Sequence, residues 1–311
     1  MAYPTPQVTK TTAATFIPEI WSDEVVAAYK KHLVAANLFK KMSFKGKKGD
    51  TVNIPSPTRG AASVKAASTA VTLIAATETN IPVLIDKHYE YSRFIEDIVE
   101  VQALSSLRRF YTDDAGYSLA KQIDTDMVQL GRGFNGGTAG SAAYSGGFVG
   151  GDGTTAYDST ATAGAGNASA LSDVAIRRTI QRLDDNDVPT DGRFFMIPPS
   201  ARNTLMGLDR YTAMDFVGEA GNANTIRNGQ IGNLYGMPVY VTSNCDTATG
   251  TLLPRVALMG HKDAAVLVEQ LGIRSQTQYK QDYLSTLYTS DTLYGVKELR
   301  DNSAFALVVP A

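Results

Sequence analysis

Three glycines form the chain's best match to a cofactor-binding motif. Gly131, Gly133 and Gly136 complete the pattern G-x-G-x-x-G. In a dinucleotide-binding protein this pattern follows a strand and opens a helix, so that the pyrophosphate meets the helix N-terminus. Here the glycines follow a predicted helix and lead into sequence rich in Gly, Ala, Ser and Thr. The motif therefore predicts the end of a helix and not a cofactor site.

The side chains that most often carry catalysis or bind metals are few and scattered. His32, His88 and His261 lie in different segments, and the chain contains neither G-x-S-x-G nor H-E-x-x-H. The single cysteine, Cys245, excludes an intrachain disulfide and a cysteine-based zinc cage, and is interpreted as a small turn residue beside a strand. We therefore expect no catalytic residue, no metal site and no cofactor.

The clusters of charged residues each allow two interpretations. The lysine-rich turn 44–50 is a phosphate site or a solvated turn, and the turn is favoured because no helix N-terminus follows its glycines. The acidic run 184–187 has the composition of a calcium loop but lacks the alternating ligands and the bidentate Glu of an EF-hand. It is predicted to be a solvated helix end. The sequence leaves three interpretations open for the remaining basic groups: contact with nucleic acid, contact with a neighbour's carboxylates, or exposure to solvent. These groups are Arg108, Arg109, Arg177, Arg178, Arg182, Lys297 and Arg300.

Length and composition exclude several classes of protein. The 311 residues, 43% of them hydrophobic, are enough for one large domain or two packed subdomains. No stretch approaches the roughly 18 consecutive apolar residues of a membrane helix, and the first residues lack a signal-peptide pattern. A net charge of −2 argues against a tight grip on nucleic acid. Only 19% of residues are charged, which favours burial of the surface against neighbouring subunits.

The first hundred residues predict an arm, a helix and a ribbon. Residues 1–20 are rich in Pro and Thr without a period, as in an extended arm, and Ser22 is a plausible N-cap for a first helix. The alternation in 51–55 predicts a short strand ended by proline. The segments 71–74 and 81–85 are predicted to pair with each other as a two-stranded ribbon. Such a ribbon buries too little surface to be stable alone, so a ribbon that projects must be held by something outside the subunit.

The clearest predicted element is a helix over residues 101–130, roughly 40 Å long. The acidic residues Asp113, Asp114, Asp124 and Asp126 are predicted to lie largely off its apolar ridge, and Gly131 and Gly133 to end the helix. The ridge consists of Leu107, Tyr111, Ala115, Leu119, Ile123 and Met127.

A second folding unit is predicted beyond a linker. Residues 131–170 are dominated by small residues and predict a long loop at a subdomain boundary. Ser172 is the predicted N-cap of the next helix, with Leu171 and Ile176 as a hydrophobic staple. The alternation of helices and strands after it indicates an α+β or α/β core. The predicted strands are 193–197, 237–241, 255–259, 266–269, 283–288 and 304–309, with a short helix through Leu205.

Several segments in this order carry a resemblance to a known family. They are 16–22, 49–55, 101–130, 182–189, 192–194, 197–199 and 232–240. Their joint order resembles that of the major capsid proteins of tailed bacteriophages, which have the Hong Kong 97 fold also used inside herpesvirus shells. The resemblance implies an α+β fold with these parts: an N-terminal arm and first helix (1–55), an extended β-ribbon loop (56–90), a peripheral domain with the spine helix 101–130 and a Gly-rich linker (91–165), an axial domain (166–265), and return strands of the peripheral domain (266–311).

The resemblance also implies a structural function. The chain would assemble with itself into hexamers and pentamers of an icosahedral head that encloses double-stranded DNA, and would not be an enzyme. Its other expected partners are a separate scaffolding protein, a portal protein, a decoration protein in some shells, and packaged DNA contacted weakly, with no membrane. Assembly is expected in the host bacterial cytoplasm. Lys65 lies in the presumed extended loop, but the sequence predicts no crosslink. The alternatives are an encapsulin-like compartment shell and an enzyme with a scattered site.

Overall fold

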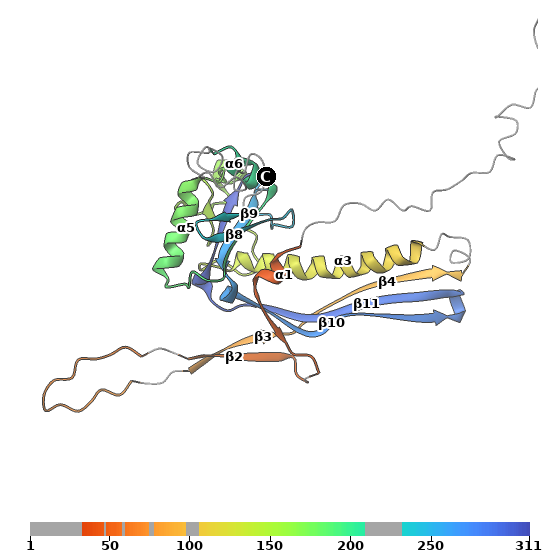
Figure 1. Cartoon of the computed structure of the whole chain (residues 1–311), viewed down its shortest axis with the longest axis horizontal. Helices are drawn as coiled ribbons and strands as arrows, with labels where there is room; N and C mark the ends of the chain where they lie inside the picture. Colours follow the sequence, from red (N-terminus) through yellow and green to blue (C-terminus); the bar gives the residue numbers. More distant parts are fainter. Residues whose placement is uncertain (1–32, 47, 58–59, 75–77, 98–105, 209–231) are drawn as a thin grey trace, which may run out of the picture.

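One long helix, α3 (Ser106–Gln129), forms the spine of the molecule (Figure 1). The computed structural model describes residues 33–46, 48–57, 60–74, 78–97, 106–208 and 232–311. The predicted ridge is confirmed from position 115 onward, because Ala115, Leu119, Ile123 and Met127 are all buried, whereas Tyr111 is partly buried. A short 3-10 turn, η2 (Leu130–Arg132), ends the helix where the glycines were predicted to end it.

A four-stranded sheet lies along the spine helix. Its strand order is β1 (Lys40–Ser43), β10 (Ala265–Lys280), β11 (Ser285–Glu298) and β4 (Lys87–Glu96), with β1 parallel to β10 and the other pairs antiparallel. The predicted strand 266–269 is the first part of β10. The predicted strand 283–288 begins too early, since η4 (Gln281–Tyr283) makes the turn that joins β10 to β11.

The projecting ribbon exists, but the prediction of its strands was partly wrong. Strand β2 (Thr51–Pro57) pairs antiparallel with β3 (Glu78–Leu84), so 51–55 and 81–84 are confirmed as strand positions, and 51–54 pair with 81–84. The segment 71–74 has no strand partner among the described residues. A β-prone sequence becomes a strand only where another strand can pair with it, and this segment lies beyond the paired part of the ribbon.

The base of the ribbon is fixed by a small apolar cluster. Val83 and Ile85 are buried against Val266 and Val268 of β10. The intervening residue Leu267 instead packs in the cluster that contains Met127 of α3. Because side chains alternate between the faces of a strand, the ribbon and the spine helix cover opposite faces of the four-stranded sheet.

A second, six-stranded sheet forms the other half of the molecule. Its order is β5 (Phe148–Val149), β12 (Ala304–Val309), β9 (Arg255–His261), β6 (Arg193–Ile197), β8 (Met237–Val241) and β7 (Asn233–Leu234). The predicted strands 193–197, 237–241, 255–259 and 304–309 are therefore confirmed. The last of these was expected among the return strands beside β10 and β11, and this was wrong. Strand β12 pairs with β9 and β5, because its six buried residues need cover on both faces.

Helices α5 (Asp173–Asp185) and α6 (Pro199–Met206) pack beside this sheet. Ser172 caps α5 as predicted, since its side chain accepts a hydrogen bond from the Ala175 amide. Leu171 and Ile176 are buried in the same cluster, as a staple requires. The first helix predicted near Ser22 and the arm lie outside the described residues. A short helix, α1 (Ala35–Leu38), precedes β1.

The segment 131–170 is irregular, as predicted, but it is packed against the six-stranded sheet. Apart from β5 and the single turn α4 (Ala161–Gly164), it consists mainly of turns. Its Tyr144 and Tyr157 are buried with Val256 and Val308 in one cluster. The segment therefore contributes to the core of the six-stranded unit. No described helix is long and apolar enough to span a membrane.

Candidate assembly surfaces

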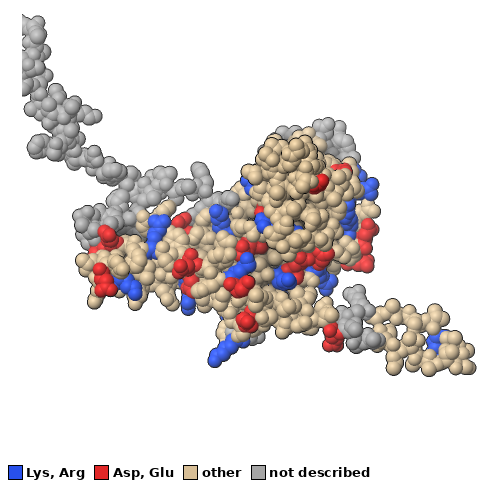
Figure 2. Space-filling model, turned by 180° about the vertical axis from the view of Figure 1, so that it is seen from behind, with Lys and Arg blue, Asp and Glu red and all other residues tan. Residues whose placement is uncertain are grey.

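The outer part of the ribbon, residues 60–74, is here called the ribbon tip. Val64 is 99% exposed and Leu73 is 88% exposed, and Val71 and Ile74 also face solvent. Figure 2 shows that the tip carries almost no charge. Four exposed aliphatic side chains on a segment without a core are typical of a surface that another protein covers.

The opposite end of the molecule carries a second exposed apolar group. At the turn between β10 and β11, Tyr283 lies 5.7 Å from Phe94, measured between ring centroids. Leu284 and Tyr279 beside them are also exposed, and the Tyr279 hydroxyl donates a 2.7 Å hydrogen bond to Asp97. We call Phe94, Tyr279, Tyr283 and Leu284 the distal end of the four-stranded sheet.

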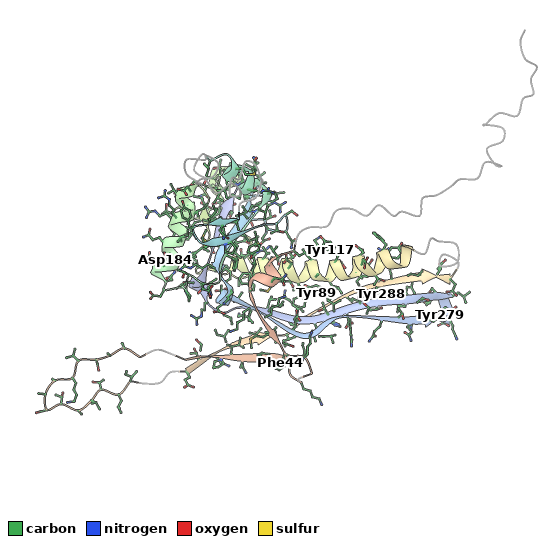
Figure 3. The ribbon with its side chains drawn as sticks, viewed as in Figure 1. Phe44, Tyr89, Tyr117, Asp184, Tyr279 and Tyr288 are labelled. Atoms are coloured by element: carbon green, nitrogen blue, oxygen red, sulfur yellow. The ribbon has the colours of Figure 1, made fainter. Side chains whose placement is uncertain are left out.

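The ribbon tip and the distal end point in opposite directions. In Figure 1 the ribbon leaves the body at one end, and the turn between β10 and β11 lies at the other. Figure 3 places Tyr279 at that far turn and Phe44 near the base of the ribbon. The two surfaces of one copy therefore cannot meet, and each is available to another molecule.

Two buried carboxylates hold the spine helix between these ends. Oδ2 of Asp126 accepts a 2.7 Å hydrogen bond from the Tyr294 hydroxyl and lies 3.0 Å from Nζ of Lys87. Asp124 accepts bonds from the Ala36 amide at 3.1 Å and from Nδ2 of Asn244 at 2.9 Å. Burial and the bond to Asp126 raise the pKa of Tyr294.

Asp124 and Asp126 lie off the apolar ridge, as predicted, but they do not face solvent. Both carboxylates are almost fully buried, because the helix contacts α1 and the sheet on flanks beside its ridge. The same prediction holds for Asp113, which is exposed. Buried carboxylates need such partners, since an unpaired buried charge is costly.

The glycine motif lies at the junction of the two sheets and contacts protein carboxylates. The Gly136 amide donates to both carboxylate oxygens of Asp301 at 3.0 Å. A Cβ on Gly133 would lie 2.6 Å from Oε2 of Glu298. Burial, followed by the charge and hydrogen bond of Asp301, raises the pKa of Glu298 to about 7, while Lys297 opposes the shift. The glycines of the motif therefore contact carboxylates of the chain itself.

A second polar network ties the end of α3 to the six-stranded unit. The Arg132 guanidinium donates to Asp246 from Nε at 2.7 Å and from Nη2 at 3.0 Å. The Tyr144 hydroxyl donates to the same carboxylate at 2.6 Å. Burial raises the pKa of Tyr144 well above its usual value. The network acts as a structural clamp, because the buried hydroxyl and the guanidinium share one carboxylate.

Among the side chains that the structure describes, the histidines and Cys245 lie apart from one another. His88 lies 3.3 Å from Asp291 on the four-stranded sheet, and Nε2 of His261 lies 2.8 Å from the Asp191 carbonyl. Cys245 is buried, and burial raises the pKa of its thiol to about 12. His32 lies outside the described residues. Among the described residues no three His, Cys, Asp or Glu side chains gather as a metal site.

The charged clusters make ordinary structural contacts where they are described. In the basic turn, Lys45 lies 3.9 Å from Glu269. In the acidic run, Asp184 lies 2.7 Å from Arg193, which supports the predicted helix end. Arg182 stacks on the Phe148 ring, 3.6 Å from its centroid. Figure 2 shows positive and negative side chains interspersed on the face it displays, without a basic surface suited to a nucleic acid.

The combination of a projecting ribbon, a spine helix and two sheets matches known proteins. A family model described as phage capsid protein matches residues 93–300, which is most of the chain. The chain belongs to the phage capsid protein family. Its function is therefore structural, as part of a capsid shell built by self-assembly, and its place is the virion capsid. A search of curated proteins found no match.

Solved structures agree on the fold of the capsid protein. A chain from Mycobacterium phage Che8 is 24% identical with a TM-score of 0.72, covering 94% of this chain and 97% of that one. A chain from the capsid of cyanophage P-SCSP1u is 17% identical with a TM-score of 0.73, covering 96% and 94%. A chain from the capsid of a native GTA particle is 8% identical with a TM-score of 0.62, covering 99% and 100%. The fold is thus the α+β fold of the Hong Kong 97 type.

Proposed function

We propose that the capsid protein builds hexamers and pentamers of an icosahedral phage head that encloses double-stranded DNA. The observation that carries this proposal is the placement of two exposed apolar surfaces at opposite ends of one subunit. A contact between two different surfaces repeats from head to tail, and closes into a ring when the rotation between subunits allows it. Rings of six and five are the closed forms that an icosahedral shell requires.

The charge of the subunit fits a container for DNA better than a DNA-binding protein. Its net charge is −2, and on the face shown in Figure 2 the basic groups are mixed with acidic ones. Tight binding through many phosphate contacts needs a basic surface. We expect weak, non-specific contact with packaged DNA, and no enzymatic step in the role of this chain.

The further partners follow from the same proposal. A shell that packages DNA needs a portal through which the DNA enters. We expect a separate scaffolding protein to guide curvature during assembly in the host bacterial cytoplasm. Decoration proteins would attach to the finished shell. The domain division into arm, extended loop, peripheral domain and axial domain is part of this proposal, with β12 assigned to the axial domain.

The contents of purified particles test the proposal. Particles made during phage growth are expected to contain nuclease-protected double-stranded DNA. Particles that hold a specific protein cargo and no DNA would contradict the proposal and favour an encapsulin-like compartment. Empty shells from expression without the packaging proteins serve as the control, because they establish how much nucleic acid is carried along without packaging.

A further inference from the structure

In the described part of the chain, three crossings join the four-stranded sheet and its spine helix to the six-stranded unit (Figure 1). Strand β9 continues through η3 (Lys262–Ala264) into β10, and β11 continues through η5 (Asp301–Ser303) into β12. The third crossing is the end of α3, which continues through η2 into residues 133–137. The first two crossings are bonded to each other, since the Leu299 amide donates to the Ala264 carbonyl at 2.8 Å.

Asp301 ties the third crossing to the second. Its two carboxylate oxygens accept from the Gly136 amide at 3.0 Å, and its carbonyl accepts from the Asn135 amide at 3.2 Å. Gly136 has a φ of 71°, a left-handed conformation that glycine adopts readily. While these bonds hold, the loop after the spine helix and the crossing between β11 and β12 move together.

Glu298 adds a second carboxyl group to this junction. It is the last residue of β11, and its side chain is hydrogen-bonded to that of Asp301. Two carboxyl groups can bond to each other only when one of them is protonated, because carboxylates accept hydrogen bonds and donate none. The partly buried Glu298 has its pKa raised to about 7 by burial and by Asp301. Asp301 is exposed, so the shared proton can exchange with solvent.

The other charged groups around the pair have partners of their own or act weakly on it. They come from the elements that pack at the junction: Lys297 of β11, Arg132 of η2, Lys262 and Asp263 of η3, and Arg300 before η5. Arg132 is paired with Asp246. Asp263 lies 3.7 Å from the buried His261. Lys297 opposes the rise in the pKa of Glu298 without cancelling it, so burial and Asp301 control the ionisation of Glu298.

We propose that the proton shared by Glu298 and Asp301 is a latch between the two halves of the capsid subunit. With the proton in place, Asp301 stays against Gly136, and the end of the spine helix is held to the crossing between β11 and β12. Loss of the proton leaves two carboxylates in contact, and their repulsion moves Asp301 away from Gly136. The latch belongs to the single subunit and does not depend on the ring assembly proposed above.

The direction of the pH dependence follows from the ionisation of Glu298. Because its pKa in the folded subunit is about 7, the latch is closed at about pH 5.5 and open at about pH 8.5. Near neutral pH both states are populated, so a modest change of pH shifts the fraction of closed subunits. The freedom of the four-stranded and six-stranded units relative to each other is therefore expected to increase as the pH rises.

Hydrogen exchange at the Gly136 amide tests the latch in the full-length subunit. After correction for the intrinsic effect of pH on exchange, its protection in wild type is expected to fall at least roughly fivefold between about pH 5.5 and pH 8.5. Glu298→Gln cannot ionise but can still donate to Asp301, so its protection should stay constant. The Gly147 amide, bonded to the Tyr144 carbonyl at 2.8 Å, is the internal reference.

A matched control separates the latch from a general effect of lost charge. Glu96→Gln, an exposed change on β4, is expected to keep the wild-type fall in protection at Gly136. Constant protection of the Gly136 amide in wild type would overturn the inference. So would a fall of equal size in wild type and in Glu298→Gln, or an equal fall at Gly147.

Spin labels measure the motion between the two halves directly. They are attached to Gln276→Cys on the four-stranded sheet and Leu252→Cys on the six-stranded unit, both exposed positions. The native Cys245 is buried, with its pKa raised to about 12, and should stay unlabelled. The distribution of distances between the labels is expected to be broader at about pH 8.5 than at about pH 5.5. Adding Glu298→Gln should keep it narrow at both.

The labelled chain with native Glu298 carries the test even if Glu298→Gln does not fold. Equal widths of its distance distribution at the two pH values would overturn the inference, because the two halves would then move no more freely without the proton. A broader distribution at the higher pH, together with the fall in protection at Gly136, supports it.

Discussion

The Tyr294 hydroxyl donates a 2.7 Å hydrogen bond to Oδ2 of Asp126, inside the contact between the spine helix and the four-stranded sheet. Tyr294 is fully buried and its ring stacks on Tyr89 at 6.0 Å between centroids. The bond joins residues 168 positions apart, and so couples α3 to β11. Figure 3 shows Tyr89 between the helix and the sheet at this contact.

Replacing Tyr294 with Phe tests the energetic weight of this bond. The ring is retained, but the buried Asp126 carboxylate loses its hydroxyl partner and keeps its contacts with Lys87 and Gln122. We expect the free energy of unfolding of the unassembled subunit to fall by about 1–3 kcal/mol, measured by urea denaturation. Tyr283→Phe, at the exposed distal end, is the control, with an expected change within about 0.5 kcal/mol. Equal effects of the two variants would contradict the role of the Asp126 bond.

Two glycine substitutions should change stability in opposite directions. A Cβ at Gly146 would clash with the Phe134 carbonyl oxygen, which belongs to the backbone and cannot move aside easily. Gly146→Ala is expected to cost about 3 kcal/mol or more. Gly116 lies in α3 with open space around the added carbon, so Gly116→Ala is expected to gain about 0.5–1 kcal/mol. Thermal unfolding of the two variants measures both changes, and a Gly146→Ala subunit as stable as wild type would contradict the close packing of this turn.

Stability should depend on pH through Glu298. Its folded pKa is raised to about 7 from 4.5, so the folded protein keeps a proton that the unfolded chain loses. The stabilisation is fully present below about pH 4.5 and is lost as the pH rises to about 7. Glu298→Gln removes this ionisation, so the variant should gain stability relative to wild type between about pH 5 and pH 8.

The difference between wild type and Glu298→Gln is the quantity to measure, because other carboxyls also contribute to the pH dependence. Asp152, for example, has its pKa lowered to about 2 by hydrogen bonds from Thr155 and Thr154, and contributes in the opposite direction. Unfolding curves at about pH 5 and pH 8 are compared with those of Glu96→Gln, an exposed site on β4. A difference between wild type and Glu298→Gln that stays constant with pH would refute the shifted pKa.

Deleting the ribbon tip should separate folding from assembly. Replacing residues 60–74 with a short Gly-Asn turn removes no residue of the buried clusters. The melting temperature of the subunit is expected to stay within about 2 °C of wild type, whereas shell formation is lost. Analytical ultracentrifugation distinguishes the two states. Normal shells from the deleted chain would contradict the assignment of the tip as an assembly surface.

Local sequence patterns predicted the helices and strands better than they predicted which distant parts of the chain each helix or strand contacts. The four-residue recurrence from Leu107 to Met127 predicted the spine helix, because one buried face is a property of the helix alone. The same pattern did not predict the burial of Asp124 and Asp126, since their partners Ala36, Asn244 and Tyr294 come from distant parts of the chain. The sequence offered one signal for their burial: these two acidic residues lie next to apolar positions in a helical stretch that is otherwise buried.

The assembly surfaces were predicted only in outline, because contacts between distant parts of the chain help to form them. The low charge of the segment beyond β2 indicated a part that needs a partner, which its exposure supports. The distal end was not predicted, because Phe94 and Tyr283 meet only after β4 and β11 have paired. Residues 131–170 were predicted to be a long loop from their small residues, yet Tyr144 and Tyr157 anchor that loop in the core.

Electron microscopy of the expressed chain, alone and with a scaffolding protein, tests the central claim most directly. The account predicts closed shells, or rings of five and six subunits, in which each ribbon reaches the neighbouring subunit. A homogeneous small species under every assembly condition, with the ribbon tip free in all of them, would contradict the claim that this chain builds a shell.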